Sequence, residues 1–276
     1  MPEPDESSSS EPTELKASDE TELEETEQFV TNPWQALRRF TPARIALGRS
    51  GHSLPTHRLL EFQLAHAQAR DAVFSPFDPP LLCQELREEG YEAIEVASQA
   101  VNRELFLRQP DMGRRLDSKS RQKLEDYATH SGKGYDAVFV LGEGLSAQAV
   151  HDNALPVLKL VTPVLIEEGW SIGPVVVARQ SRVALGDEIG QVLGAKQVAI
   201  LIGERPGLSA AASLGIYLTY DPYVGRLEAE RNCISNIHPQ GSSYSTAAST
   251  LLYLMAEARR LKRSGVTLKD ERELDE

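Results

Sequence analysis

The chain has 276 residues, of which 41% are hydrophobic and 25% are charged, as is usual for a soluble globular protein with one large domain or two smaller ones. It has no uninterrupted apolar run of membrane-spanning length, and its N-terminus is acidic, so the sequence predicts neither a transmembrane helix nor a secretory signal. The two cysteines, Cys83 and Cys233, exclude a disulfide framework and favour a reducing cytoplasm.

The net charge of −12 is concentrated at the N-terminus, where residues 1–28 carry eleven acidic residues and a single lysine. This segment is rich in serine, proline and threonine, and we expect it to be a disordered tail. It serves either as a docking or addressing segment or only to keep the protein soluble. The rest of the chain is close to neutral, which argues against nucleic acid as the main partner.

Residues 29–132 are expected to form a mainly helical N-terminal region. Apolar residues at helical spacing predict helices over 56–74, 81–89 and 118–129. Residues 133–276 are expected to form an α/β domain, because the pattern changes at about residue 135. Short apolar runs at 136–141, 174–178, 197–202 and 214–219 alternate with helical stretches near 146–169, 185–194 and 244–262. Together they predict a Rossmann-like, mostly parallel sheet with helices on both faces.

In an open parallel sheet, ligands bind beside the carboxyl ends of the strands, which directs attention to loops 142–146, 179–183 and 203–207. The first loop, Gly142-Glu143-Gly144-Leu145-Ser146 followed by Ala147, matches a variant of the dinucleotide fingerprint. A Rossmann-type oxidoreductase is therefore the alternative function. An acidic residue to hold the ribose is missing at the expected spacing, and two glycines at a strand-to-helix turn also occur for tight-turn geometry alone.

The sequence contains no recognisable catalytic constellation of its own. A nucleophile elbow, a Walker A loop and a cobalamin-ligating D-x-H-x-x-G motif are all absent, and the six histidines form no metal-binding pair. We therefore assign no catalytic residue and no metal ligand.

Two segments are dense in polar residues. Gly203-Glu204-Arg205-Pro206-Gly207 follows an apolar run and is either a rigid recognition loop or a turn with a surface ion pair. In segment 228–239, Cys233 is either a buried small hydrophobic residue or part of the lining of a polar pocket.

At these segments the sequence resembles the small (light) subunit of ethanolamine ammonia-lyase. The resemblance covers nearly everything after the tail and rests on segments 41–49, 62–67, 108–116, 144–146, 187–196, 203–208 and 230–237. It implies a hetero-oligomer with a large subunit that is a TIM-type barrel, with adenosylcobalamin held between the two subunits. It also implies that the large subunit binds ethanolamine, and that radical deamination yields acetaldehyde and ammonia.

The resemblance further implies cofactor-binding residues, which fall here on Val183, Glu204 and Cys233. A cytoplasmic location, either free or inside a bacterial microcompartment, is implied as well, with no membrane and no nucleic acid as partner. Because the chain has no catalytic constellation of its own, it is expected to be inactive alone.

Overall fold

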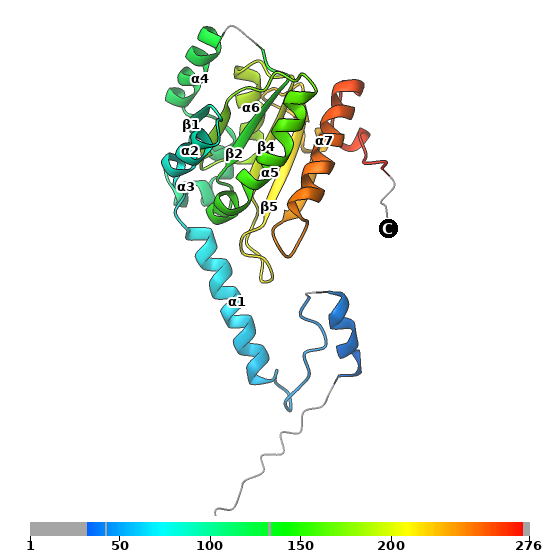
Figure 1. The fold of residues 1–276 in the computed structure, drawn as a ribbon. Coiled ribbons are helices and arrows are strands. Elements are labelled where there is room, and N and C mark those ends of the chain that lie inside the picture. Colours follow the sequence, from blue (N-terminus) through cyan, green and yellow to red (C-terminus); the bar gives the residue numbers. More distant parts are fainter. Residues whose placement is uncertain (1–31, 42, 132–133, 273–276) are drawn as a thin grey trace, which may run out of the picture. The chain divides into compact units, whose positions relative to one another are not determined.

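The computed structural model describes residues 32–41, 43–131 and 134–272 (Figure 1). The chain divides into two units, Met1–Thr56 and His57–Glu276. In the first unit, η1 is a 3-10 helix over Pro33–Phe40, and the side chain of Asn32 caps it by accepting a hydrogen bond from the Trp34 N–H. The tail expected over 1–28 lies outside the described residues.

The second unit is built around one six-stranded sheet. Its strands are β1 (Ala93–Ala97), β2 (Ala137–Gly142), β3 (Val175–Arg179), β4 (Gln197–Gly203), β5 (Leu214–Tyr220) and β6 (Arg231–Ile237). They lie in the order β1-β3-β2-β4-β5-β6. The pairings of β1 with β3, β3 with β2 and β2 with β4 are parallel, whereas β4–β5 and β5–β6 are antiparallel.

The α/β class is confirmed, but the prediction of a mostly parallel sheet is wrong, because the sheet is mixed. The connection over 204–213 holds no helix, so after β4 the chain turns back and β5 pairs with it antiparallel. Parallel neighbours would need a longer crossover. A buried strand has the same apolar pattern in either orientation, and the pattern could not reveal the turn.

Two strands were not predicted. β1 lies inside the segment expected to be mainly helical, and it pairs with β3 at one edge of the sheet. β6 forms the other edge from a polar segment. The domain boundaries near 28 and 132 and the likeness to Rossmann-type sheets stay predictions.

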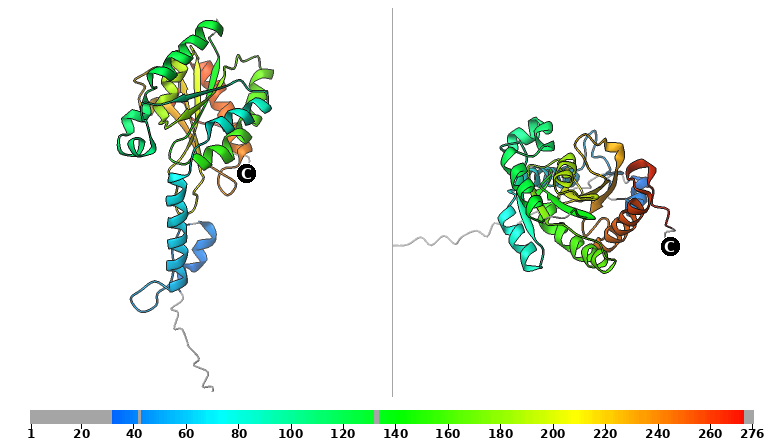
Figure 2. Two further views of the ribbon diagram at one scale, coloured as in Figure 1. Left: turned by 90° about the vertical axis from the view of Figure 1, so that its left-hand side faces the viewer. Right: turned by 90° about the horizontal axis from the view of Figure 1, so that it is seen from above.

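Helices cover both faces of the sheet (Figure 2). On the first face lie α2 (Pro79–Glu88), α5 (Ala147–Glu167) and α7 (Tyr244–Leu261), and on the second face lie α4 (Ser118–Ser131) and α6 (Val183–Val192). The remaining elements are α1 (Thr56–Phe74), α3 (Arg103–Arg108) and the short 3-10 helices η2 (Pro110–Arg114), η3 (Glu228–Glu230) and η4 (Gly265–Thr267). The predicted helices therefore form close to their expected bounds.

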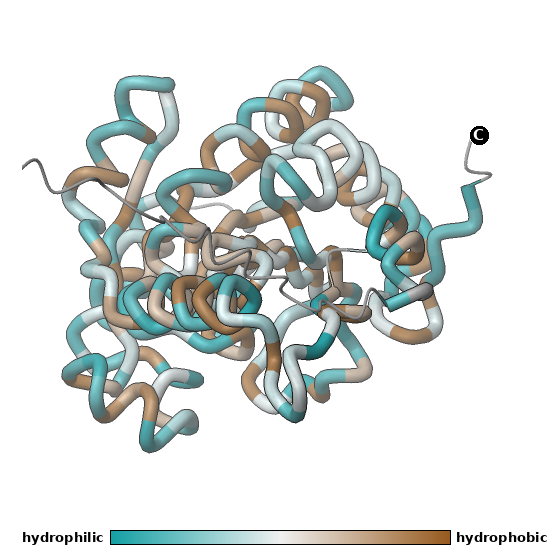
Figure 3. Tube along the Cα trace, turned by 90° about the horizontal axis from the view of Figure 1, so that it is seen from below, coloured by the Kyte–Doolittle hydropathy of each residue, from teal (hydrophilic) through white to brown (hydrophobic). Residues whose placement is uncertain are grey.

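The hydrophobic core occupies two layers, one on each face of the sheet. Every residue of β2 and of β4 is buried, as the apolar runs 137–142 and 198–203 predict, and the buried Gln197 at the start of β4 donates a hydrogen bond to the Met255 carbonyl. In Figure 3 hydrophobic and hydrophilic stretches alternate along the trace of the helices, as expected for helices that pack one side on the core. Among the described residues, α5 alone is long and apolar enough to cross a membrane by length and composition. Its residues Val150, Val157 and Val161 are fully buried in the core, which accounts for that composition.

Candidate functional site

One face of the β5–β6 pair is open to solvent. Leu214, Ile216 and Leu218 of β5 point to the first face, where they belong to the core layer that includes α7. Tyr217 of β5 points the other way, because side chains alternate along a strand. Its register partner is Cys233 of β6. Three residues of β5 and β6, which we call the open wall, therefore lie on the second face, where Tyr217 is half-buried and Cys233 and Ser235 are exposed.

A hollow of about 420 Å³ adjoins the open wall. Four parts of the fold meet around it, namely the turn after β2, the start of α6, the end of β4 with the loop that follows, and Tyr217. Its lining residues are Gly144, Leu145, Arg182, Val183, Ile202, Gly203, Glu204, Arg205 and Tyr217. Apolar and charged side chains alternate in this lining, which suits a ligand with an apolar body and polar substituents.

The structure brings the three residues assigned from the sequence toward one surface. Val183 and Glu204 both line the hollow. Cys233 is not in its lining, but it lies directly opposite Tyr217 in the β5–β6 register, and Tyr217 is in the lining. That these three residues contact a cobalamin stays a prediction.

The Glu204 carboxylate is anchored by β5, β6 and the loop before β5. Ser213 Oγ donates a hydrogen bond to its Oε2 at 2.6 Å, and the Asn236 backbone N–H donates to the same oxygen at 3.2 Å. Gly215 leaves room for the side chain, since a Cβ there would lie 2.9 Å from Oε1. Both of these hydrogen bonds are accepted by Oε2. Among the ion pairs of the described residues, none joins Glu204 to Arg205. Oε1 is therefore the acceptor left for a ligand.

The Cys233 thiol is free and exposed, so the alternative of a buried small hydrophobic residue is wrong. Partial desolvation of the sulfur beside Tyr217 raises the pKa of Cys233, an effect that the Tyr217 hydrogen bond reduces and the Glu204 charge reinforces. Burial also raises the pKa of Tyr217, and the neighbouring Cys233 adds to that rise. The raised pKa values favour the neutral forms of both groups at neutral pH, and a reactive thiolate at Cys233 is therefore disfavoured.

Positive charge gathers at the rim of the hollow. The Arg182 guanidinium lies 4.3 Å from the centre of the Phe106 ring, and its Nη2 donates to the Phe106 carbonyl at 3.2 Å. Burial lowers the pKa of Arg182, and repulsion from Arg103, Arg114 and Arg205 lowers it further. Its Nε is buried and has no partner in the described part of the chain. The contacts with Phe106 thus hold Arg182 in place at the rim of the hollow.

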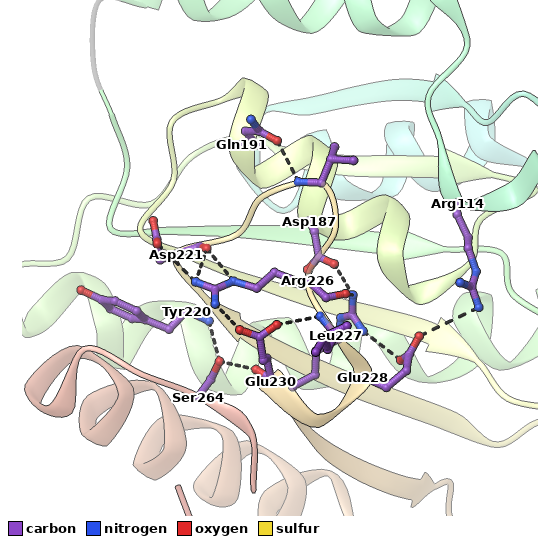
Figure 4. Close-up of polar contacts among 12 residues, drawn as sticks. Arg114, Asp187, Gln191, Tyr220, Asp221, Arg226, Leu227, Glu228, Glu230 and Ser264 are labelled. Atoms are coloured by element: carbon purple, nitrogen blue, oxygen red, sulfur yellow. Dashed lines mark hydrogen bonds and ion pairs between the residues drawn. The ribbon is translucent and has the colours of Figure 1, made fainter. Parts of the chain in front are cut away.

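A buried ion pair ties α6 to β6 (Figure 4). Asp187 of α6 is 2% exposed and Arg231, the first residue of β6, is 6% exposed. The Asp187 carboxylate accepts a hydrogen bond from Arg231 Nη2, while Arg231 Nη1 donates to Glu228 Oε2 at 2.8 Å. Figure 4 shows Asp187 facing the loop between β5 and β6. The ion pair thereby fixes α6, whose first residue Val183 lines the hollow, to β6, which carries Cys233 and Ser235 of the open wall.

The glycine-containing turn after β2 packs against the end of β4. Gly144 has a φ of 58°, and the Leu145 N–H donates to the Gly203 carbonyl at 2.8 Å, so the turn rests on the end of β4. The Ser146 side chain caps the N-terminus of α5, and the Glu143 carboxylate is 3% exposed. This geometry gives no support to the dinucleotide alternative, which requires the helix N-terminus to face a pyrophosphate.

Sequence reasoning missed three residues of this site. The apolar run 214–219 predicts a core strand that includes Tyr217, although a tyrosine in an aliphatic run indicates a position where the ring packs and the hydroxyl reaches a polar surface. Ser213 lies in a plain linker, and its bond to Glu204 depends on the antiparallel return of β5. Arg182 lies in a loop that the sequence singled out, but no pattern assigned it a role.

Comparisons with known proteins identify the family. A family model described as ethanolamine ammonia-lyase light chain (EutC) matches residues 31–269. Among similar proteins named ethanolamine ammonia-lyase small subunit, that of Pseudomonas fluorescens (strain SBW25) is 55% identical over 240 residues, covering 87% of this chain and 87% of the relative. That of Azotobacter vinelandii (strain DJ) is 54% identical over 243 residues, with 88% and 90% covered. That of Ralstonia nicotianae (strain GMI1000) is 52% identical over 252 residues, with 91% and 93% covered. The chain belongs to the ethanolamine ammonia-lyase light chain family.

Proposed function

We propose that this chain forms one side of an adenosylcobalamin site, which a large subunit closes from the other side. The observation that carries the proposal is the open wall beside the hollow, toward which Val183, Glu204 and Cys233 converge from three separate elements. The family relation supports the choice of ligand, because ethanolamine ammonia-lyases depend on cobalamin.

The residues of this surface fit a corrin, which has a broad apolar face and a rim of amide side chains. Leu145, Val183 and the Tyr217 ring supply apolar contact. Oε1 of Glu204 can accept an amide N–H from the corrin rim.

The proposed role of this chain is binding and orientation. Bound adenosylcobalamin supplies the radical chemistry that deaminates ethanolamine to acetaldehyde and ammonia. Tyr217 and Cys233, whose pKa values are both raised by burial, are proposed to contribute contacts and hydrogen bonds in their neutral forms. We assign ethanolamine binding to the large subunit, a TIM-type barrel, in a cytoplasmic hetero-oligomer that is free or enclosed in a microcompartment.

The first expected result concerns the division of labour. The purified chain with adenosylcobalamin and ethanolamine should produce no acetaldehyde, and adding the large subunit should restore turnover, because one side of the site is missing without it. An acetaldehyde assay of each subunit and of the mixture measures this. Turnover by the small subunit alone would contradict the proposal.

The second expected result concerns Glu204. In the assembled complex, Glu204→Ala should weaken cobalamin binding by about 1–3 kcal/mol, because a hydrogen bond to a charged group is lost. This corresponds to a dissociation constant roughly 5- to 150-fold higher. Ethanolamine affinity should stay unchanged, since the substrate is assigned to the other subunit. The measurement is a spectroscopic cobalamin titration of wild type and variant, with folding checked by circular dichroism.

Glu257→Ala is the matched control for this titration. Glu257 lies on α7, on the first face of the sheet, where its carboxylate pairs with Arg260. Its removal should leave the cobalamin dissociation constant unchanged. Equal affinities for the Glu204→Ala complex and wild type would remove Glu204 from the site.

A further inference from the structure

A second buried ion pair, between Arg103 and Glu143, lies at the carboxyl ends of β2 and β3. Glu143 directly follows β2 and is 3% exposed. Its Oε1 accepts a hydrogen bond from Arg103 Nη1 at 3.0 Å, and its Oε2 accepts one from the backbone N–H of Gln180 at 2.7 Å. One carboxylate thus bridges the turn after β2 and the turn after β3.

Arg103 extends this bridge to two further backbone groups. Its Nη1 also donates to the Gly144 carbonyl at 2.7 Å. Its Nε and Nη2 donate to the Val73 carbonyl at 3.0 and 2.8 Å, in the last turn of α1. A planar guanidinium can serve all these acceptors at once, whereas a lysine ammonium on a flexible stem cannot hold the same geometry.

The pair fills a position that many α/β proteins leave for a ligand. The connection after β2 runs through α5 on the first face, and the connection after β3 runs through α6 on the second face. At such a point the loops of neighbouring strands diverge and usually leave a binding crevice. Here Arg103 and Glu143 occupy the divergence, and the hollow adjoins it, lined by the residues that follow β2 and β3 and by the ends of β4 and β5.

Burying the charges of Glu143 and Arg103 at this point costs free energy, because both groups lose contact with water. Burial raises the pKa of the Glu143 carboxyl, although the Gln180 N–H and the Arg103 charge act against the rise. Burial likewise lowers the pKa of Arg103. A buried pair of this kind often stabilises a fold no better than apolar side chains would, which directs attention to what the pair positions.

The two bridged turns lead directly into the hollow. Gly144 and Leu145 follow Glu143, and Arg182 and Val183 follow Gln180 after one residue. Gln180 has a φ of 51°, in the left-handed region that costs energy for a residue with a side chain. Its N–H is the group that Glu143 holds, so the carboxylate fixes a strained turn at the entrance to α6.

We propose that Glu143 and Arg103 are positioning residues for the cofactor pocket, which hold the turns after β2 and β3 so that Leu145 and Val183 line it together. This assignment rests on the proposed function. Neither residue is in the lining of the hollow, and each acts through the backbone groups that it binds.

The test compares two equally buried glutamates in the complex with the large subunit. In Glu143→Gln, the amide nitrogen must face either Arg103 or the Gln180 N–H, so one of the two bonds becomes a contact between donors. We expect at least a tenfold higher dissociation constant for the probe cyanocobalamin. We also expect a raised KM for adenosylcobalamin with kcat at saturation largely kept, and faster amide exchange at Gln180.

Glu188→Gln is the matched control. Glu188 is 2% exposed and accepts hydrogen bonds from Arg115, Leu116 and Arg121, none of which lines the hollow. The Glu188→Gln variant should lose about as much stability as Glu143→Gln does, but its complex should keep the wild-type affinity for cyanocobalamin. If Glu143→Gln does not assemble, Arg103→Lys keeps a charge beside Glu143 and should still weaken cyanocobalamin binding, because the bonds to Gly144 and Val73 are lost.

Equal effects of Glu143→Gln and Glu188→Gln on cyanocobalamin affinity would overturn the assignment, as would unchanged affinity in both Glu143→Gln and Arg103→Lys. Failure of the proposed function looks different. In that case the wild-type complex itself would not bind cyanocobalamin, and the positioning role would fall with it.

Discussion

Gly144→Ala is expected to lower the free energy of unfolding by roughly 4 kcal/mol or more, a loss seen only where a substitution meets a specific obstacle. A Cβ on Gly144 would lie 2.2 Å from the Gly203 carbonyl oxygen and 2.9 Å from its nitrogen. Both are backbone atoms of β4, which cannot rotate away. The residue would also carry a side chain at a φ of 58°. Urea unfolding followed by circular dichroism measures the loss.

Gly169→Ala separates the two causes of that loss. Gly169 has a φ of 77°, and a Cβ there would meet no atom within 4 Å. Its replacement should therefore cost only the conformational strain, about 1–2 kcal/mol. If both variants lose the same stability, the contact between the turn and β4 is not what makes Gly144 necessary.

Breaking the buried pair of α6 and β6 should cost nearly as much. Asp187→Ala leaves the Arg231 guanidinium, whose side chain is 1% exposed, without its buried counter-charge. Removing one member of a buried pair costs about 3–5 kcal/mol, whereas replacing both by apolar residues is often close to neutral. The double variant Asp187→Leu/Arg231→Met should therefore be more stable than the sum of its single changes predicts.

A double-mutant cycle in urea measures this coupling. Glu104→Ala is its control, because the pair of Glu104 with Arg108 is exposed and its loss should leave the free energy of unfolding nearly unchanged. Additive losses in the cycle would show that Asp187 and Arg231 stabilise the fold independently.

The sequence predicts the elements of this fold better than their arrangement. The strands β2, β3, β4 and β5 follow from apolar runs, since a strand buried on both faces needs no polar residue. β6 has exposed Cys233, Ser235 and Asn236, so its sequence shows no strand pattern until it is known to be an edge with an open face. β1 is a short strand in a mainly helical region, and its pairing with β3 is set by tertiary contact.

The sequence predicts some residues of the candidate site and misses the ion pairs around it. Val183, Glu204 and Cys233 came from the resemblance, and the structure brings them near one hollow without testing their contacts to a cofactor. The ion pairs of Glu143 and Asp187 could not be predicted, because each joins residues more than 35 positions apart. Such pairs depend on how the crossovers bring strand ends together, which local sequence does not encode.

At the open wall, the backbone bonds that hold the strands together are separate from the side chains that are proposed to contact a ligand. β5 pairs with strands on both sides and the edge strand β6 pairs with β5, so the proposed ligand would meet side chains held by a framework that exists before binding. Little conformational freedom is then lost on association, which favours affinity. Substitutions at Cys233 or Ser235 change the chemistry of the surface and leave the strand ladder intact. The proposed ligand preference of this face can therefore change through substitution with little loss of fold stability.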